Sequence, residues 1–580
     1  MSKGEGLQLN GYNSLLVKND EMTMMHFEHQ VKDKGSRYFG GIINQNTGIP
    51  SPSHTGTGSV IGSWVCSYVN KDSAYFENEE LAERIEMALD YMLNKQHNDG
   101  TISPGWTNYH SPPDTAFIVT GFAQIYSLLK KNKKESFADK VALFLKRTIP
   151  AMLTGGCHTP NHRWVLASAL AHLYNIFGNL ELKQRAEEWL LEGMDMTEDG
   201  EWTERSNGIY NSVSNICLYH TASLLGKTEL YGYIRKNLDM MMYLVHPDGE
   251  VVTDYSGRQD LGNRFDLSPY HLIYRLMAYK DTNPQYMSMA DLALENMEDT
   301  GPVNNHMMLG YLYFPFIKEE NIDRAELPKE YEVFINEKYQ VKENMNKMEA
   351  VGHYSRIEHS SMHTSFGAQT VRYRNKDISA TIMGMNSSIF SLRHGKIKLL
   401  GTQIYTSFSP GVVEFDSIKK IDGGYRLSAV LEKGYTGPLP PLDNSKPNNT
   451  SIWYLLPHQL RESTHKQTFH IWVDILRKEK DWSIHIQTDE LEDVFTQVVF
   501  VFDENIASKG EGIENLNEGN YFWKEGKLDI QQEKNKMTLL AGEYEHWQKS
   551  LGNKNTGNNL AFYRVNLLSP IDKKFSISIS

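Results

Sequence analysis

The sequence predicts an α+β, multidomain chain in which an α/α toroid of helical hairpins precedes an antiparallel β-sandwich. Two observations support this fold class. Apolar segments of helix length recur with short breaks across Phe76–Phe316, whereas the segments after Asn346 are short, β-branched and roughly alternating. A charged stretch, Glu320–Ala350, lies between them and is interpreted as a connector. With 580 residues the chain is long enough for more than one domain, and we place these at 1–345 and 346–580.

The expected helices of the first part are of two kinds. Glu80–Gln96 is amphipathic, whereas Trp164–Phe177 is apolar on nearly every side. An amphipathic helix belongs to an outer layer and an all-apolar helix to an inner one. Alternation of the two kinds predicts concentric layers in an incomplete barrel, and an irregular helical bundle is the alternative. Further expected helices are Asp114–Asn132, Phe137–Leu153, Leu182–Met194, Ser214–Gly226 and Tyr270–Lys280.

The second part of the chain shows the two-residue alternation of apolar and polar residues that is typical of β-strands. Its segments alternate apolar and polar residues between turn residues, which is typical of antiparallel sheets with one buried face. Thr436–Ser451 is rich in proline and asparagine and is expected to be a long surface loop. The expected strands lie within Ser365–Asn375, Asp377–Met385, His465–Lys478, Asp481–Asp489, Thr496–Asp503, Asn535–Tyr544 and Asn559–Ser569.

Composition excludes several classes of function. The net charge of −13 argues against general binding of nucleic acids or anionic membranes. The three cysteines, Cys66, Cys157 and Cys217, are too few for a disulfide framework and fit a reducing compartment. No secretory signal is visible, so we expect a cytoplasmic protein, or a secreted one if the N-terminus was trimmed. The oligomeric state stays open.

The stretch "GGCHTPNHRWVLASALAHLYNIFG" (Gly155–Gly178) places polar residues at the start of an apolar helix. Thr159 suits the N-cap and Pro160 the first helical position, so Asn161, His162 and Arg163 fall in the first turn and His158 precedes it. The free N–H groups of a helix N-terminus form an anion site, and a substrate carboxylate is the expected guest. Simple capping of a buried helix is the alternative.

Three further polar loops each lead into an apolar helix. In a toroid such loops gather at one end, so the four loops are expected to line one cleft. Their aromatic residues suit stacking against sugar rings, with core packing as the alternative. The loops contain Trp106, Asn108, His110 and Asp114; Glu204, Arg205, Tyr210 and Asn211; and Asp254, Tyr255, Arg258 and Arg264.

These features resemble the heparinase II/III-like polysaccharide lyases, which join an α/α toroid to a β-sandwich. The resemblance rests on the Asn161-His162 pair, on Tyr210 in "GIYN" 48 residues after His162, and on "HSSMHTSFG" (His359–Gly367). It implies that the pair, the tyrosine and a β-domain histidine meet in one cleft; His363 is the first candidate for that histidine and His359 the second. The stretches "TPNHRWV" and "SPPDTAF" also resemble a branch that releases L-rhamnose from glucuronate at chain ends.

The resemblance implies β-elimination on an acidic oligosaccharide or polysaccharide. Asn161, His162 and either Arg205 or Arg258 would neutralise the uronate carboxylate, so that charge can develop on it in the transition state. Tyr210 is the first candidate for the base that takes the C5 proton, provided that a nearby cation favours the phenolate. Histidines are easier bases near neutral pH.

The histidines that could act as the base are His363, His110 and His158. The residues expected to bind substrate are His158, Arg163, Arg205, Arg258, Tyr255, Asn108 and Trp106. No cofactor and no catalytic metal are expected, although His359 could belong to a structural divalent-metal site.

Two other functions remain open on the sequence. A six-hairpin glycoside hydrolase would need two carboxylic acids beside the scissile bond, and Asp114, Asp254 and Glu204 could supply them. A carbohydrate-binding protein without activity would keep the aromatic and arginine residues. "TGTGSVIG" (Thr55–Gly62) lacks the spacing of a dinucleotide-binding loop, and His54 beside it could face the cleft.

Overall fold

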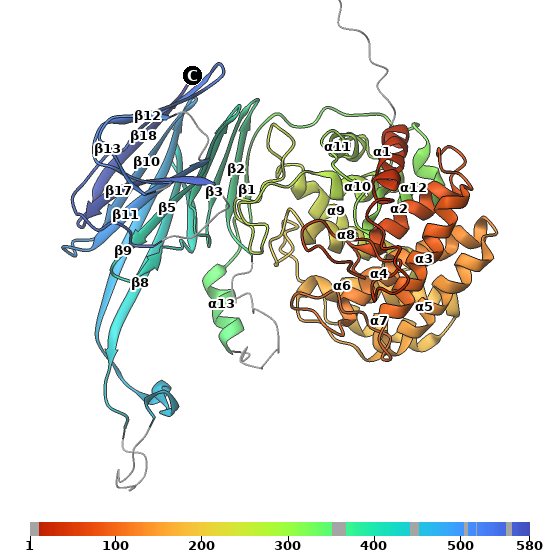
Figure 1. Cartoon of the computed structure of the whole chain (residues 1–580). Helices are drawn as coiled ribbons and strands as arrows, with labels where there is room; N and C mark the ends of the chain where they lie inside the picture. Colours follow the sequence, from red (N-terminus) through yellow and green to blue (C-terminus); the bar gives the residue numbers. More distant parts are fainter. Residues whose placement is uncertain (1–10, 351–366, 441–451, 504–507, 518, 553–558) are drawn as a thin grey trace, which may run out of the picture. The chain divides into compact units, whose positions relative to one another are not determined.

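The computed structural model of the chain describes residues 11–350, 367–440, 452–503, 508–517, 519–552 and 559–580 (Figure 1). Two compact units are present. The first contains the chain up to Lys329 together with Lys347–Gly367. The second contains Glu330–Asn346 and Ala368–Ser580. None of the described helices is long and apolar enough to cross a membrane.

The first unit consists of helices in two layers. Its inner helices are α2 (Thr57–Val69), α4 (Pro112–Lys131), α6 (Pro160–Phe177), α8 (Tyr210–Leu225), α10 (His271–Asp281) and α12 (Met307–Tyr313). Its outer helices are α1 (Gly11–Met25), α3 (Glu79–Lys95), α5 (Glu135–Thr154), α7 (Leu180–Leu191), α9 (Leu230–Met241) and α11 (Pro284–Leu294).

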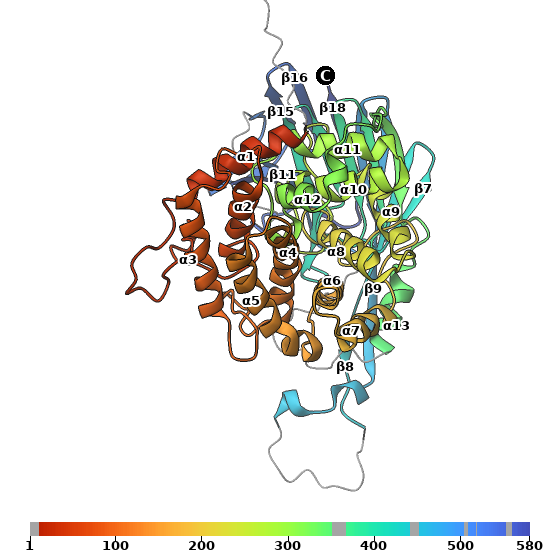
Figure 2. The same cartoon turned by 90° about the vertical axis from the view of Figure 1, so that its right-hand side faces the viewer.

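The inner helices form a ring. Each packs against the next, and α12 contacts both α10 and α2. Figure 2 shows α3, α5, α7, α9 and α11 around the outside of this ring. The two layers differ as the amphipathic and apolar patterns predict, because α6 buries most of its residues while α7 buries only Leu182 and Ala186. The toroid predicted from the sequence is therefore confirmed.

The second unit is a sandwich of two large sheets. In one sheet the strand order is β1-β2-β3-β4-β5-β11-β17-β14-β13, with β6 paired to β5; in the other it is β12-β15-β16-β18-β10-β9-β8-β7. Neighbouring strands are antiparallel except for β14 and β17. Apolar residues of both sheets form one core, which contains Phe390, Phe500, Trp523 and Phe575.

The strands of this unit are mostly short, but β8 and β9 form a long hairpin. Their bounds are β1 (Glu330–Ile335), β2 (Thr370–Asn375), β3 (Ile378–Met383), β4 (Phe390–His394), β5 (Ile397–Thr406), β6 (Gly411–Val412), β7 (Ser417–Ile421), β8 (Gly424–Thr436), β9 (Ser463–Lys478), β10 (Asp481–Thr488), β11 (Phe495–Asp503), β12 (Ser508–Gly510), β13 (Ile513–Asn517), β14 (Asn520–Trp523), β15 (Lys527–Gln532), β16 (Asn535–Leu540), β17 (Leu560–Leu568) and β18 (Asp572–Ile579).

The stretch Glu320–Ala350 is more than the connector that its charge suggested. It contains β1, which pairs with β2 in antiparallel register, and the helix α13 (Val341–Ala350). The second unit thus begins at Glu330, ahead of the boundary expected at 345/346. The charged residues of "EYEVFI" made this segment resemble a linker. In the structure its glutamates are the more exposed residues of the strand, while Phe334 packs against the sandwich core.

Candidate active site in the helical unit

Glu204 connects three of the polar loops of the first unit. Its carboxylate accepts hydrogen bonds from the backbone N–H of Asn161 (3.1 Å) and from the Asn161 side-chain amide (2.9 and 3.0 Å). It also forms an ion pair with Arg258. Because all three residues are largely buried, Glu204 fixes the start of α6 against the loops that precede α8 and α10.

This arrangement changes the interpretation of the α6 N-terminus. The sequence predicted that its N–H groups would receive a substrate carboxylate, but in the structure Glu204 accepts from the first of them. Thr159 is the N-cap residue, yet its side chain makes no capping bond to the backbone. An internal carboxylate stabilises a helix N-terminus for the same electrostatic reason that a substrate would.

Tyr210, the first residue of α8, lies beside Arg258. The guanidinium carbon of Arg258 is 4.7 Å from the centre of the Tyr210 ring, and the Gln259 amide donates to the phenol oxygen. Burial raises the pKa of Tyr210 above its ordinary value, although Arg258 and Gln259 oppose the rise. The phenol is therefore protonated at neutral pH, and its O–H remains available to donate.

His162 lies in the same cluster as a neutral imidazole. Its ring is 4.8 Å from that of His158, centre to centre, and 6.1 Å from that of Phe117. Burial lowers the pKa of His162 to about 3, with smaller contributions from His158, Arg258 and His54. Its Nδ1 atom is buried and has no hydrogen-bond partner among the described residues.

The cluster continues through Phe117 of α4. His54 stacks on the Phe117 ring at 4.3 Å, and burial lowers the pKa of His54. Asp114, one turn earlier on α4, accepts from Ser111 (2.6 Å) and from Asn108 (2.9 Å). Asn108 therefore serves to hold the loop before α4.

The structure thus brings together Asn161, His162, His158, Tyr210 and Arg258. Arg258, and not Arg205, is the cation at the Tyr210 ring.

Several other predicted residues point elsewhere. His110 bonds Asp99 (2.8 Å) and stacks on His97 at 3.8 Å. Arg163 pairs with Asp195 (2.6 Å) and Glu192 (3.2 Å). In this structure, therefore, neither His110 nor Arg163 is directed at His162.

The remaining substrate-binding candidates are either buried or exposed on a turn. Arg205 is buried with a left-handed backbone (φ 47°), and its carbonyl accepts from Gly257 (2.7 Å), so it joins the two loops that carry Glu204 and Arg258. Tyr255 is fully buried, whereas Trp106 is 90% exposed on a turn. His363 and His359, the histidines expected from the second domain, lie outside the residues that the structure describes.

Two positioning residues were missed at the sequence level, Gln259 and Asp260. Asp260 is fully buried and accepts from Ser206 (3.0 Å), Gly208 (3.0 Å) and Ser256 (2.8 Å). It therefore shapes the turn that leads into Tyr210. The run "GRQD" (Gly257–Asp260), in which both residues follow Arg258, is the local signal that could have suggested them.

A cavity of about 210 Å³ is built from the loops that precede α10 and α12, and its lining includes none of the five clustered residues. Its wall includes Phe265, which lies against Gly208 just before Tyr210, and Pro302, whose neighbour Val303 donates to the His54 carbonyl (3.0 Å). Carboxylates line it as well, from Asp266, Glu298 and Asp299. Within the described part of the chain, no group of three or more His, Cys, Asp or Glu side chains could hold a metal ion.

No family model and no curated protein sequence matches the chain. Solved structures do match it. Heparinase III aligns with 100% of this chain and 86% of its own at 11% identity and a TM-score of 0.52. A Paenibacillus xanthan lyase aligns with 99% of this chain and 57% of its own at 10% identity and a TM-score of 0.56.

A chondroitin AC lyase from Streptomyces coelicolor A3 aligns with 100% of this chain and 80% of its own at 10% identity, with a lower TM-score of 0.46. The two stronger matches cover both units of the chain. The helical toroid and the antiparallel sandwich therefore occur here in the same order as in those enzymes, and the chain has the fold of the heparinase-like polysaccharide lyases.

Proposed function

We propose that the helical unit carries a lyase site, which cleaves a glycan containing uronic acid by β-elimination. The observation that carries the proposal is the cluster itself. A protonated Tyr210 lies between Arg258 and Gln259, in the loops that also hold Asn161 and neutral His162. The shared fold with heparinase III and xanthan lyase supports the same class of reaction.

Arg258 is the group that would bind the substrate carboxylate. A guanidinium has five N–H donors, and the pair with Glu204 leaves some of them for a second carboxylate. Neutralising that carboxylate makes the C5 hydrogen more acidic, since negative charge develops on the carboxylate as the proton leaves. Glu204 would hold Arg258 and Asn161 in place without taking part in the proton transfer.

The proton transfers would be divided between His162 and Tyr210. His162 is neutral, so it can accept the C5 proton without first losing one. A substrate carboxylate beside it would raise its pKa toward the ordinary range, which makes it a stronger base. Tyr210 keeps its proton at neutral pH and would donate it to the departing C4 oxygen.

The finer proposal is an exo-acting enzyme that releases L-rhamnose from glucuronate. Support comes from the cavity formed by the loops before α10 and α12, which has Asp266, Glu298 and Asp299 in its lining. Carboxylates there would repel a second uronate but can accept hydrogen bonds from the hydroxyls of an uncharged sugar. A neutral leaving sugar suits such a pocket.

A hydrolase is less well supported, because the carboxylates that it would use are already engaged. Glu204 is bonded to Asn161 and Arg258, and Asp114 accepts from Ser111 and Asn108. Asp254 is buried 3.8 Å from His246. A hydrolytic acid or base has to reach the glycosidic bond or a water molecule.

The test is a panel of rhamnose-capped glucuronate oligosaccharides, alginate and glycosaminoglycans, monitored by the ultraviolet absorbance of the unsaturated uronate. We expect absorbance to rise with one substrate class and Tyr210→Phe to lower kcat about 10²–10⁴-fold. Tyr219→Phe, farther along α8, is the matched control and should retain activity. New reducing ends without the chromophore would mean hydrolysis, and binding without any product would mean a non-catalytic protein.

A further inference from the structure

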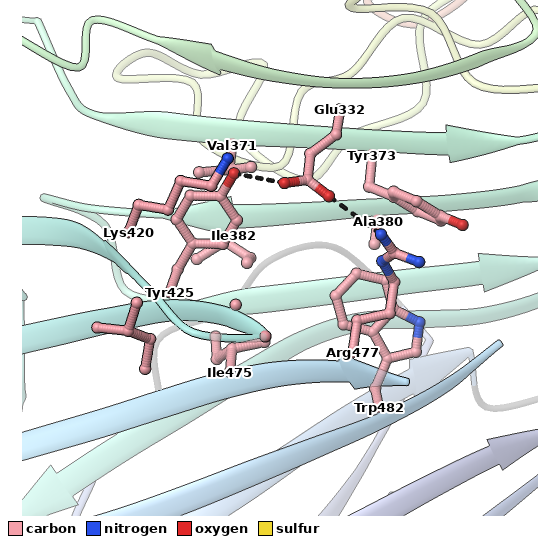
Figure 3. A pocket seen from close by; sticks show the side chains of 13 residues that line it. Glu332, Val371, Tyr373, Ala380, Ile382, Lys420, Tyr425, Ile475, Arg477 and Trp482 are labelled. Atoms are coloured by element: carbon pink, nitrogen blue, oxygen red, sulfur yellow. Dashed lines mark hydrogen bonds and ion pairs between the residues drawn. The ribbon is translucent and has the colours of Figure 1, made fainter. Parts of the chain in front are cut away.

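The β-sandwich unit has a cavity of its own, about 190 Å³ in volume, between its two sheets (Figure 3). One wall comes from β1, β2 and β3, and the other from the β7–β8 turn, β9 and β10. Since β1 and β7 are terminal strands of their sheets, the cavity lies at an edge of the sandwich. Pockets for drug-sized ligands have about 300–1,000 Å³, so this one suits a single ring.

The inner part of the cavity is apolar and aromatic. Val371, Ile382 and Ile475 contribute aliphatic surface, and Tyr425 and Trp482 contribute rings. All five are buried members of the sandwich core, so these walls are fixed by packing. They offer flat apolar surface to one face of a ligand.

A carboxylate lies at the cavity between donors from the opposite sheet. Glu332 of β1 accepts from the Tyr425 hydroxyl (2.7 Å) and from Arg477 (3.2 Å), as the dashed lines in Figure 3 mark. The guanidinium of Arg477 also covers the Tyr373 ring at 4.3 Å. A carboxylate can accept about four hydrogen bonds, so Glu332 can still accept from a ligand hydroxyl.

Lys420 gives the cavity an excess of positive charge. It is exposed on β7 and lines the cavity, and it forms no ion pair with any other described residue. Among the residues that line the cavity, Lys420 and Arg477 are two cations and Glu332 is one carboxylate. The negative charge of an anionic ligand would neutralise the second cation.

We propose that this cavity binds one hexuronate ring. One face of the sugar would lie on Tyr425 and Trp482, its hydroxyls would donate to Glu332, and its carboxylate would pair with Lys420. A neutral sugar would leave Lys420 without a counter-charge. An aromatic acid would bring no hydroxyl for Glu332. The site belongs to the sandwich and involves no bond cleavage, so it holds whether or not the helical unit is a lyase.

The test is calorimetric titration of the full-length protein with D-glucuronate, D-glucose and benzoate. For a ligand of one ring we expect a Kd of about 1 mM for glucuronate, and at least tenfold weaker binding of the other two compounds. Lys420→Ala should weaken glucuronate binding at least tenfold. Lys419 is also exposed on β7 but does not line the cavity, so Lys419→Ala is the matched control and should leave glucuronate affinity unchanged.

Arg258→Ala removes the group proposed to bind the uronate carboxylate in the helical unit, so it separates the two sites, and it should leave glucuronate binding to the sandwich cavity intact. The proposal would be overturned by the absence of saturable glucuronate binding, by equal binding of glucose, or by wild-type affinity in Lys420→Ala. Loss of binding in Arg258→Ala together with wild-type binding in Lys420→Ala would assign the uronate site to the helical unit. Failure of the lyase assay would affect none of these outcomes.

Discussion

At the scale of single residues, the carboxylate of Glu204 decides how the polar loops of the toroid are arranged. Two of its partners come from one residue of α6, and the third comes from a loop that follows α9. Burial raises the pKa of Glu204, while Arg258 and Asn161 lower it. Breaking a buried pair of this kind leaves an uncompensated charge behind.

Glu204→Gln is therefore expected to be costly. The neutral amide removes the counter-charge of Arg258 and places an NH₂ group where Asn161 also donates. We expect the free energy of unfolding of the helical unit to fall by about 3 kcal/mol, as measured by urea titration. We also expect loss of lyase activity in the ultraviolet assay.

Glu192→Gln is the matched control for that change. Glu192 also pairs with an arginine, Arg163 at 3.2 Å, but its side chain is 50% exposed. Exposed pairs contribute about 0–1 kcal/mol, so this variant should unfold close to wild type. If both variants lost the same free energy of unfolding, burial of the Glu204 pair would not be the cause of the destabilisation.

At the scale of elements, the inner ring depends on close approach of backbones. Gly121 lies in the middle of α4, where a methyl group would be 2.5 Å from the carbonyl oxygen of Val303. That oxygen belongs to the short turn before α12, so it cannot move away as the end of a flexible side chain can. Glycine is needed at this position for space and not for an unusual backbone angle.

Gly121→Ala is expected to destabilise the helical unit by about 1–3 kcal/mol, the usual cost of overpacking. Gly232→Ala, on the outer helix α9, is the control, since a methyl group there would meet nothing within 4 Å. The control should be neutral or up to about 1 kcal/mol more stable, because alanine is the better helix former. Thermal unfolding of both variants measures the difference, and equal behaviour would contradict the close approach.

At the scale of the whole molecule, the two units hold their histidines differently. In the helical unit, burial lowers the pKa of His162, His271 and His306 to about 3. In the sandwich, burial lowers the pKa of His546, while the partly exposed side chain of His470 lies 3.0 Å from the carboxylate of Asp489. The units should therefore respond differently to acid.

We predict that the helical unit loses stability first as the pH falls. The ordinary pKa of histidine is about 6.5, so between pH 6.5 and 3 the unfolded chain binds protons that the folded unit does not. The contribution of these histidines is complete above pH 6.5 and is lost progressively below it, by up to about 1.4 kcal/mol per pH unit for each.

Scanning calorimetry at pH 7, 6, 5 and 4 and constant ionic strength measures this effect. The transition that Gly121→Ala lowers identifies the helical unit, and it should move to lower temperature faster than the transition of the sandwich. Parallel movement of both transitions would argue against buried neutral histidines as the cause.

The sequence by itself determined the order and the kind of the elements. Helical and strand periods are local properties, so they predicted the alternating layers of the toroid and seven strands of the sandwich, namely β2, β3, β9, β10, β11, β16 and β17. They also predicted that Asn161 and His162 begin an inner helix, as α6 shows. The roles of these residues, and of His363, stay predictions.

Only the tertiary structure decided which polar groups meet. Glu204 accepts a hydrogen bond at the N-terminus of α6, and Arg258, not Arg205, lies over the ring of Tyr210. The hexuronate cavity likewise combines Glu332 with Lys420, which is far away in the chain. Such partners are set by the path of loops and the pairing of distant strands, as the left-handed backbone of Arg205 illustrates. Periodicity carries information about burial, but not about which of several buried charges will face one another.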